Sequence, residues 1–227
     1  MDDDREPRQT RQARLTRDIS MEFSDVVTSR RMTRDFSSSP VPRDVILGVV
    51  DLASRAPSAG KTQGWSLLVL EGASAQRYWD LSLPAERRGT FAWPGLLRAP
   101  VIALSFADPD AYVQRYAEPD KAHTGLGEGV EAWQAPYWTI DASFATMTFL
   151  LGAHDAGLGA LFFAVFNAAD EIRNEFGVPG HLQLLGAIAL GYPAGGEGEA
   201  PARQGRSAGR PRRAASEILH FAGWTDN

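Results

Sequence analysis

Residues 140–166, IDASFATMTFLLGAHDAGLGALFFAVF, are the stretch that decides the fold. Residues 140–156 are apolar on nearly every side, which predicts a long buried helix. Gly157 and Gly159 end this helix, because glycine is favoured just past a helix C-terminus. The apolar run at 160–166 then predicts a buried strand. A buried helix followed directly by a buried strand indicates a layered domain that contains both helices and a sheet.

Further helices and strands are predicted on both sides of this stretch. Four other segments are predicted as helices, at 21–29 (with Ser20 as the N-cap), 42–56, 73–83 and 168–176. Short apolar runs bounded by turn residues predict three more strands, at 65–70, 101–107 and 184–190. Helices and strands alternate loosely along the chain, so the pattern fits an α+β or an α/β domain.

The two ends of the chain differ in composition from this domain. Residues 1–19 are highly charged and poor in aliphatic side chains, so we expect a disordered or loosely ordered tail. Residues 20–227 form the folded domain, in which 194–227 is an extended C-terminal arm. Within the arm, residues 203–213 contain five arginines and no acid, whereas 217–224 is again partly apolar. We therefore expect the basic stretch to cross a surface on which the chain end is docked.

Composition restricts the possible functions. The chain has 227 residues, 44% hydrophobic and 22% charged, as in ordinary globular domains. A net charge of −5 argues against a nucleic-acid partner, because binding phosphate backbones requires concentrated positive charge. No apolar run approaches the roughly 18 residues that span a bilayer, and no secretory signal is recognisable. We therefore expect no membrane partner and a cytoplasmic location. With no cysteine and four scattered histidines, no metal site is expected.

Residues 29–36, SRRMTRDF, place three arginines directly after a predicted helix. The side chains of Arg30, Arg31 and Arg34 suit charge-assisted, bidentate binding of phosphate oxygens. A solvated basic helix end, stabilised by the helix dipole, would have the same composition. The segment is therefore a candidate phosphate site with a purely structural alternative.

Residues 55–65, RAPSAGKTQGW, connect a helix to a strand. Pro57 and Gly60 predict a turn. Donors and acceptors for the edge of a heteroaromatic ligand are supplied by Ser58, Lys61, Thr62 and Gln63. An ordinary helix-to-strand loop is the alternative.

Residues 157–167, GLGALFFAVFN, lack the full glycine pattern of a dinucleotide-binding turn, and they follow a helix instead of preceding one. The small side chain of Ala164 would let the backbone approach a flat ligand. A plain buried strand explains the same segment.

Taken in order, these segments resemble the FMN-dependent nitroreductase family, over about residues 24–224. The family pattern Arg-Arg-Ser-x-Arg-x-Phe is matched by residues 30–36, and Ala-Pro-Ser-x-x-Asn-x-Gln-Pro-Trp by residues 56–65. An Asp-x-Gly-x-Ala helix that ends in Gly-Leu-Gly is matched by 141–159, a small pair before Phe-Asp by 164–167, and Ile-x-Leu-Gly-Tyr-Pro by 188–193. A basic segment with Glu-x-x-His matches 210–220. Each motif is short and degenerate, but the common order and spacing are specific.

The resemblance implies an α+β fold: a three-layer sandwich with a mostly antiparallel sheet flanked by helices, in a homodimer with a domain-swapped C-terminal arm. Two FMN molecules would lie at the dimer interface, with NAD(P)H as the reductant. The residues that it assigns to FMN binding are Arg30, Arg31, Met32, Arg34, Pro57, Ser58, Ala59, Lys61, Gln63, Phe163, Ala164, Val165, Arg210 and Arg212. The arginines would hold the phosphate, the ribityl chain and the pyrimidine edge. The 57–59 turn would approach the flavin from the other subunit, and the Val165 amide would face flavin N5.

Three departures from the family pattern concern this site. Met32 replaces the usual serine, Lys61 the usual asparagine, and Ala164-Val165 a pair of glycines. A lysine ammonium cannot accept a hydrogen bond from flavin N3, so Lys61 either adds a cation near the ring or points into solvent. FMN binding is still expected, and a deazaflavin is the other cofactor that the resemblance allows.

The resemblance favours an enzyme that reduces a small nitro, quinone or enone compound with NAD(P)H in alternating half-reactions. The same fold also serves dehydrogenation of a biosynthetic intermediate, dehalogenation, flavin turnover, or flavin binding without catalysis. A phosphate-binding regulatory protein without flavin is a further alternative. No residue is assigned a catalytic role. Aromatic residues within 107–137 indicate a pocket cover or, equally, plain packing: Tyr112, Tyr116, His123, Trp133 and Tyr137.

Overall fold

The computed structural model describes residues 21–195 and 209–224. The predicted tail at 1–19, the predicted cap Ser20 and much of the C-terminal arm lie outside these residues. Within them, the chain forms a four-stranded sheet in the order β1-β2-β4-β3, and every neighbouring pair is antiparallel. The strands are β1 (Trp65–Glu71), β2 (Val101–Ala107), β3 (Gly159–Phe163) and β4 (Gln183–Gly191). The sheet confirms the expected α+β class over the α/β alternative.

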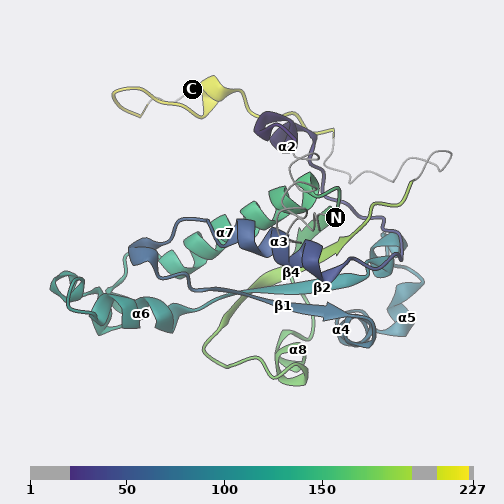
Figure 1. Cartoon of the computed structure of the whole chain (residues 1–227), viewed down its shortest axis with the longest axis horizontal. Helices are drawn as coiled ribbons and strands as arrows, with labels where there is room; N and C mark the ends of the chain where they lie inside the picture. The colour runs from purple at the N-terminus through teal and green to yellow at the C-terminus, as the bar shows by residue number, and fades with distance from the viewer. Residues whose placement is uncertain (1–20, 196–208, 225–227) are drawn as a thin grey trace, which may run out of the picture.

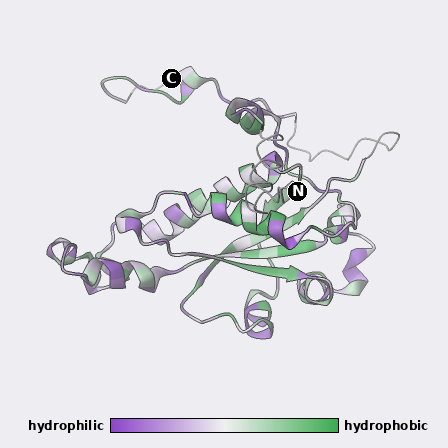
Figure 2. Cartoon of the chain, in the orientation of Figure 1, coloured by the Kyte–Doolittle hydropathy of each residue, from purple (hydrophilic) through white to green (hydrophobic). Residues whose placement is uncertain are grey.

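Helices cover both faces of this sheet (Figure 1). On one face lie α3 (Arg43–Ala53) and α7 (Tyr137–Asp155), and on the other lie α4 (Ala73–Ser82) and α8 (Ala169–Glu175). Side chains alternate between the faces along β2, so that Ile102 and Leu104 pack in the layer of α4, whereas Val101 and Ala103 pack in the layer of α7. Because β2 is buried on both faces, it is an almost unbroken apolar run. The strands are accordingly the most hydrophobic part of the molecule (Figure 2).

Most predicted elements are confirmed within a few residues, and β2 agrees at both ends. The prediction for β3 is wrong at its C-terminal end, because the strand stops at Phe163, where its pairing with β4 ends at Ala187. Helix α2 (Phe23–Ser29) begins two residues later than predicted, and its N-cap is Glu22 without a side-chain capping bond. These differences are small for boundaries inferred from periodicity.

Helix α7 is not buried on all sides, as its apolar sequence predicted. Its inner residues, such as Phe149 and Ala153, are fully buried, but Phe144 and Met147 are 48% and 40% exposed. The helix therefore leaves an apolar stripe uncovered by the rest of the described chain. No helix among the described residues has the length and apolarity needed to cross a membrane.

The described C-terminal stretch, 209–224, passes α2 and stands clear of the sheet and its flanking helices (Figure 1). Its apolar residues Phe221 and Trp224 are 80% and 82% exposed. The expectation that the chain end is docked is therefore not met within a single chain. Within the part of the chain that the structure describes, these two side chains stay largely uncovered, and exposed apolar groups of this kind often mark an interaction surface.

Candidate functional site

The C-terminal end of α7 makes hydrogen-bonding contacts to both ends of the segment 21–29, which includes α2, and the candidate phosphate site begins directly after it. Asp155 Oδ1 accepts a hydrogen bond from the backbone nitrogen of Met21 at 2.7 Å. Ser29 Oγ lies 2.7 Å from His154 Nε2, at the other end of α2. Because both ends of this short helix are attached to α7, the position of the residues that follow it is fixed relative to the core.

Arg30, directly after α2, carries a buried Nε that has no hydrogen-bond partner among the described residues. Burial lowers the pKa of its guanidinium, and the neighbouring cations Arg212 and Arg31 lower it further. The described residues give Arg30 no ion pair, although three cations converge here. A buried, unsatisfied donor among like charges is costly, and an anion would relieve both costs. The residues therefore fit a phosphate group.

Arg31 and Arg210 have different surroundings from Arg30. Arg31 is exposed, and its Nη1 donates to the carbonyl oxygens of Thr28, Ser29 and Arg30 at 2.8–3.0 Å. It caps the last carbonyl groups of α2, as basic side chains often do at helix C-termini. Arg210 is exposed in the C-terminal stretch. Of the predicted phosphate residues, Arg30, Arg31 and Arg212 are brought together.

The segment after Arg31 is attached to the edge of the sheet. Met32 forms a parallel bridge with Ala160 of β3, and the Thr33 nitrogen donates to the Ala160 oxygen at 3.0 Å. Arg34 Nη1 donates to the Met32 oxygen at 3.0 Å, and its guanidinium lies 5.2 Å from the centre of the Trp93 ring. These contacts hold the Arg34 side chain beside the end of β3.

A cavity of about 360 Å³ opens at this end of β3. The residues that line it include four of the predicted flavin residues, Arg34, Phe163, Ala164 and Val165, together with Trp79, Phe91 and Trp93. The rings of Trp79 and Phe163 are parallel, with centres 6.1 Å apart. The sequence analysis missed Trp79, Phe91 and Trp93, because a buried tryptophan or phenylalanine in this region is equally well explained as core.

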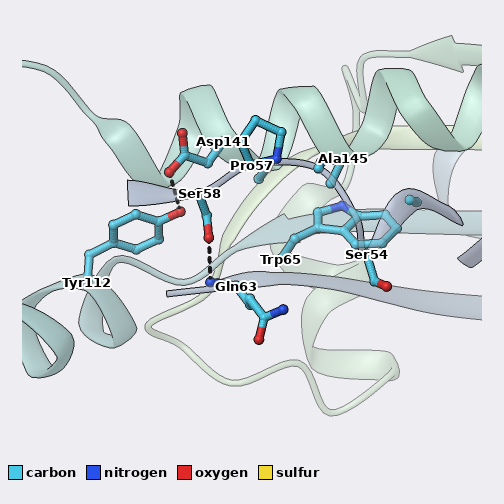
Figure 3. Close-up of a pocket in the computed structure, with 12 residues that line it drawn as sticks. Ser54, Pro57, Ser58, Gln63, Trp65, Tyr112, Asp141 and Ala145 are labelled. Carbon is cyan, nitrogen blue, oxygen red and sulfur yellow. Dashed lines mark hydrogen bonds between the residues drawn. The ribbon is translucent and has the colours of Figure 1, made fainter. Parts of the chain in front are cut away.

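The second predicted group lies on the turn that includes the short 3-10 helix η1 (Ala59–Lys61). Asp141 Oδ2, on α7, accepts hydrogen bonds from the Ala59 nitrogen and from the Tyr112 hydroxyl, both at 2.8 Å. The Gln63 nitrogen donates to Ser58 Oγ at 3.0 Å (Figure 3). The buried carboxylate therefore connects the turn, α7 and Tyr112.

Tyr112 reaches Asp141 because Gly64 leaves room for its ring. A Cβ on Gly64 would lie only 2.7 Å from the ring atom Cε2 of Tyr112. Burial raises the pKa of Tyr112, and the hydrogen bond to Asp141 raises it further. Tyr112 is thus a neutral hydrogen-bond donor at neutral pH. It helps to hold the turn through Asp141, whose carboxylate binds both Tyr112 and the turn.

Lys61 and Gln63 stand on the outer side of this turn. Their φ angles are 56° and 58°, in the left-handed region that is unfavourable for residues other than glycine, asparagine and aspartate. Both side chains are exposed, and they border a shallow hollow with Asp51 and Arg55. Strained backbone of this kind persists only where its surroundings hold it, and it is common at ligand sites.

Behind the turn lies a cavity of about 260 Å³, lined by Pro57, Ser58, Gln63, Trp65, Tyr112, Asp141 and neighbouring small residues (Figure 3). It shares no lining residue with the cavity at the end of β3. A single chain therefore brings together each of the two predicted groups but does not join one to the other.

The predicted aromatic cover lies mainly in helix α6 (Pro109–Ala117) and the turns after it, at one end of the molecule (Figure 1). Trp133 is buried and packs against Tyr112, Tyr116 and Tyr137 at ring-centre distances of 4.7–5.8 Å. His123 is exposed. These aromatic side chains largely pack on one another, in agreement with the packing alternative.

Comparison with known proteins adds to this geometry. Residues 27–192 match the model of a family described as the nitroreductase family. A 4-nitrobenzoate reductase of Nocardioides sp. (strain LMS-CY) is 30% identical over 199 residues, which cover 75% of this chain and 80% of that protein. An NADH dehydrogenase of Thermus thermophilus is 27% identical over 183 residues, covering 73% and 83%.

A solved structure of an Exiguobacterium sibiricum 255-15 protein in complex with FMN has a similar fold. Its TM-score is 0.67 at 17% identity, and the match covers 89% of this chain and 98% of that one. At this identity the likeness concerns the fold, which agrees with the sheet and helix layers described above.

Proposed function

Because this chain belongs to the nitroreductase family of flavin oxidoreductases, we propose that it binds FMN and uses NAD(P)H to reduce a small nitro, quinone or enone compound. The observation that carries the proposal is the buried, unpaired Nε of Arg30 next to Arg212. This arrangement calls for an anion, and it lies on the same segment as the side chain of Arg34. One cofactor with a phosphate at one end and an electron-poor ring at the other fits both arginines.

At the phosphate end, Arg30 and Arg212 bind the phosphate oxygens directly, and Arg31 and Arg210 add positive charge around them. Each charge-assisted hydrogen bond contributes roughly 1.5–3 kcal/mol. Arg30 is the strongest of these ligands, because its donor is already desolvated and has no competing partner. Met32 contributes only its backbone, since its side chain packs against the apolar core.

At the ring end, Arg34 provides a cation that stabilises negative charge at one edge of the ring, and the Val165 amide donates at the other. FMN supplies the reversible acceptance and donation of a hydride when it is bound. The Trp93 ring and the Met32 carbonyl keep Arg34 in place. Phe163 and Ala164 complete this wall of the site.

We assign the two separate groups of residues to one site in a homodimer. Pro57, Ser58 and Ala59 of the partner subunit, with the nearby Lys61 and Gln63 of the partner subunit, then approach the ring from the other side. The apolar stripe of Phe144 and Met147 on α7 supports this assignment, because it needs a covering surface. The exposed Phe221 and Trp224 support a swapped arm that docks on the partner subunit.

The first test is the absorbance spectrum of the purified protein, followed by mass spectrometry of the released cofactor. We expect the flavin spectrum, the mass of FMN rather than of a deazaflavin, and anaerobic bleaching by NADPH or NADH. A colourless protein that does not bind added FMN would overturn the proposal. A yellow protein that neither nucleotide reduces would indicate flavin binding without this catalysis.

The second test compares Arg30→Ala with Arg43→Ala. Arg43 lies on α3 and forms an exposed ion pair with Glu71. Removing the buried phosphate ligand should cost about 2–3 kcal/mol of binding energy, or roughly a hundredfold in FMN affinity. Arg43→Ala should leave the affinity unchanged. Equal losses of FMN affinity in the two variants would mean that the arginines contribute only general positive charge and that Arg30 is not a specific phosphate ligand.

A further inference from the structure

His154 lies beside the candidate phosphate site but belongs to none of the motifs that indicated it. It occupies the last turn of α7, and its Nε2 lies 2.7 Å from Ser29 Oγ, one residue before Arg30. Ser29 Oγ itself donates to the Asp25 carbonyl oxygen at 2.5 Å. Because its only proton is used in that bond, Ser29 accepts from His154, and Nε2 carries a hydrogen. The second ring nitrogen, Nδ1, is then the atom that can gain a proton.

The charges around the imidazole come from two elements. Arg30 and Arg31 face it from the segment after α2, and Asp155 adjoins it on α7. Burial lowers the pKa of His154, Arg30 and Arg31 lower it further, and Asp155 opposes them. The ring is therefore neutral at pH 7 when no anion neutralises the two arginines.

We propose that His154 is the proton-accepting member of the phosphate site, so that a phosphate monoester held by Arg30 and Arg212 binds together with one proton on His154. This inference rests on the proposed function for the identity of the natural ligand. A dianion next to Arg30 reverses the local charge, and the imidazole then takes its proton from solvent at Nδ1. The Nε2–H bond to Ser29 stays in place, so the ring needs no reorientation.

Linkage gives the proposal a measurable sign. If binding takes up a proton, affinity rises as pH falls, by at most tenfold per pH unit for one proton. The range from pH 8 to pH 7 is suitable, because the phosphate itself remains mostly dianionic there. Riboflavin, which has the same ring but no phosphate, should bind without this dependence.

The test uses the full-length protein freed of flavin, and His154→Gln as the variant. Glutamine keeps an N–H donor for Ser29 but cannot titrate. FMN is titrated calorimetrically in two buffers with different heats of ionisation, which gives the number of protons exchanged. The wild type should take up several tenths of a proton more than His154→Gln, and its affinity should gain about twofold from pH 8 to pH 7 relative to the variant. The control is His181→Gln, which should behave as the wild type, because His181 is exposed and lies in the turn before β4.

A second measurement does not depend on the variant or on flavin binding. The pKa of the His154 ring in the wild-type protein, measured by NMR, should rise by about one pH unit when inorganic phosphate is added. Equal proton uptake in wild type and His154→Gln, with an unchanged His154 titration, would overturn the inference while leaving FMN binding intact. Failure to bind FMN, together with an upward shift in phosphate, would overturn the proposed function and leave the anion site.

Discussion

Replacement of Asp141 by alanine should loosen the turn at 57–63 without disturbing the sheet. The carboxylate is 7% exposed and accepts two hydrogen bonds at 2.8 Å, from Ala59 and Tyr112. Without it, a backbone N–H and a tyrosine hydroxyl are left in a buried place with no acceptor. The turn then loses its connection to α7, and the left-handed residues Lys61 and Gln63 lose the support that holds their strained backbone.

The size of the effect follows from the two bonds. A hydrogen bond to a charged group contributes about 1.5–3 kcal/mol, so the pair accounts for roughly 3–6 kcal/mol before other terms. Removing a buried carboxylate also removes its desolvation penalty, which offsets part of this sum. We expect a net loss of about 2–4 kcal/mol of unfolding free energy, or roughly 1–2 M in the urea midpoint. Tyr112→Phe removes one bond at nearly constant volume and should lose about half as much.

The assay is urea denaturation at fixed protein concentration, with FMN affinity measured on the same preparations. Ser143→Ala is the matched control, because Ser143 lies on the same helix, is exposed, and among the described residues bonds only to the Thr139 carbonyl oxygen. The control should stay within about 0.5 kcal/mol of the wild type. FMN affinity should fall about tenfold or more in Asp141→Ala, the equivalent of 1.4 kcal/mol. Equal urea midpoints for Asp141→Ala and Ser143→Ala would refute the reasoning. A lowered urea midpoint with unchanged FMN affinity in Asp141→Ala would mean that the turn lies away from the flavin.

Three further predictions address other parts of the molecule. Met147→Glu should shift the protein from dimer to monomer in sedimentation at micromolar concentration, because it puts a charge on the uncovered stripe of α7. Val130→Glu should not, since Val130 is as exposed as Met147, at 42%, but lies in the 3-10 helix Val130–Ala132 outside that stripe; a wild-type monomer would contradict the proposed dimer. Lys61→Asn should raise the unfolding free energy by about 0.5–1 kcal/mol, because asparagine tolerates a φ of 56° better than lysine; an unchanged or lower denaturation midpoint would contradict this. Ion pairing with Arg115 lowers the pKa of Asp120 to about 2, so the pair stabilises the turn after α6 above the unfolded pKa near 4 and is lost as pH falls toward 2. The hydrogen-exchange protection factors of that turn, which correct for the pH dependence of intrinsic exchange, should fall across this range in the wild type but not in Asp120→Asn, and an equal fall in both would contradict the assignment.

Periodicity predicted the elements well where the chain itself carries the boundary. The strand β2 lies between Pro100 and Asp108, and both residues end an apolar run in a way that sequence reasoning can recognise. The end of β3 was missed because Ala164, Val165 and Phe166 are as apolar as the strand before them. The strand ends where its pairing with β4 ends, at Phe163 and Ala187, although β4 itself continues to Gln183, and no local pattern records where the pairing of two strands ends.

The candidate site was predicted in part, through motifs that are contiguous in sequence. The turn at 57–63 was predicted from such a motif, whereas the grouping of Arg34 with Val165 was implied by the resemblance to the nitroreductase family, since the two residues lie on different motifs. The Asp141 connection was missed, because it joins residues 82 and 29 positions apart. A signal was nevertheless present, since a carboxylate near the start of a strongly apolar helix must find buried donors.

The left-handed residues of the 57–63 turn have a consequence for how this site can change in evolution. The path of the turn is fixed from beneath, by Asp141 and Tyr112, which are distant in sequence. Among the described residues, the side chains of Lys61 and Gln63 have no hydrogen bond that helps to hold it. Mutation at these two positions can therefore alter charge and shape on the outer face while the backbone stays where it is. Selection for a new ligand and selection for a stable fold meet here only in the left-handed backbone, which restricts the residue types that these two positions accept.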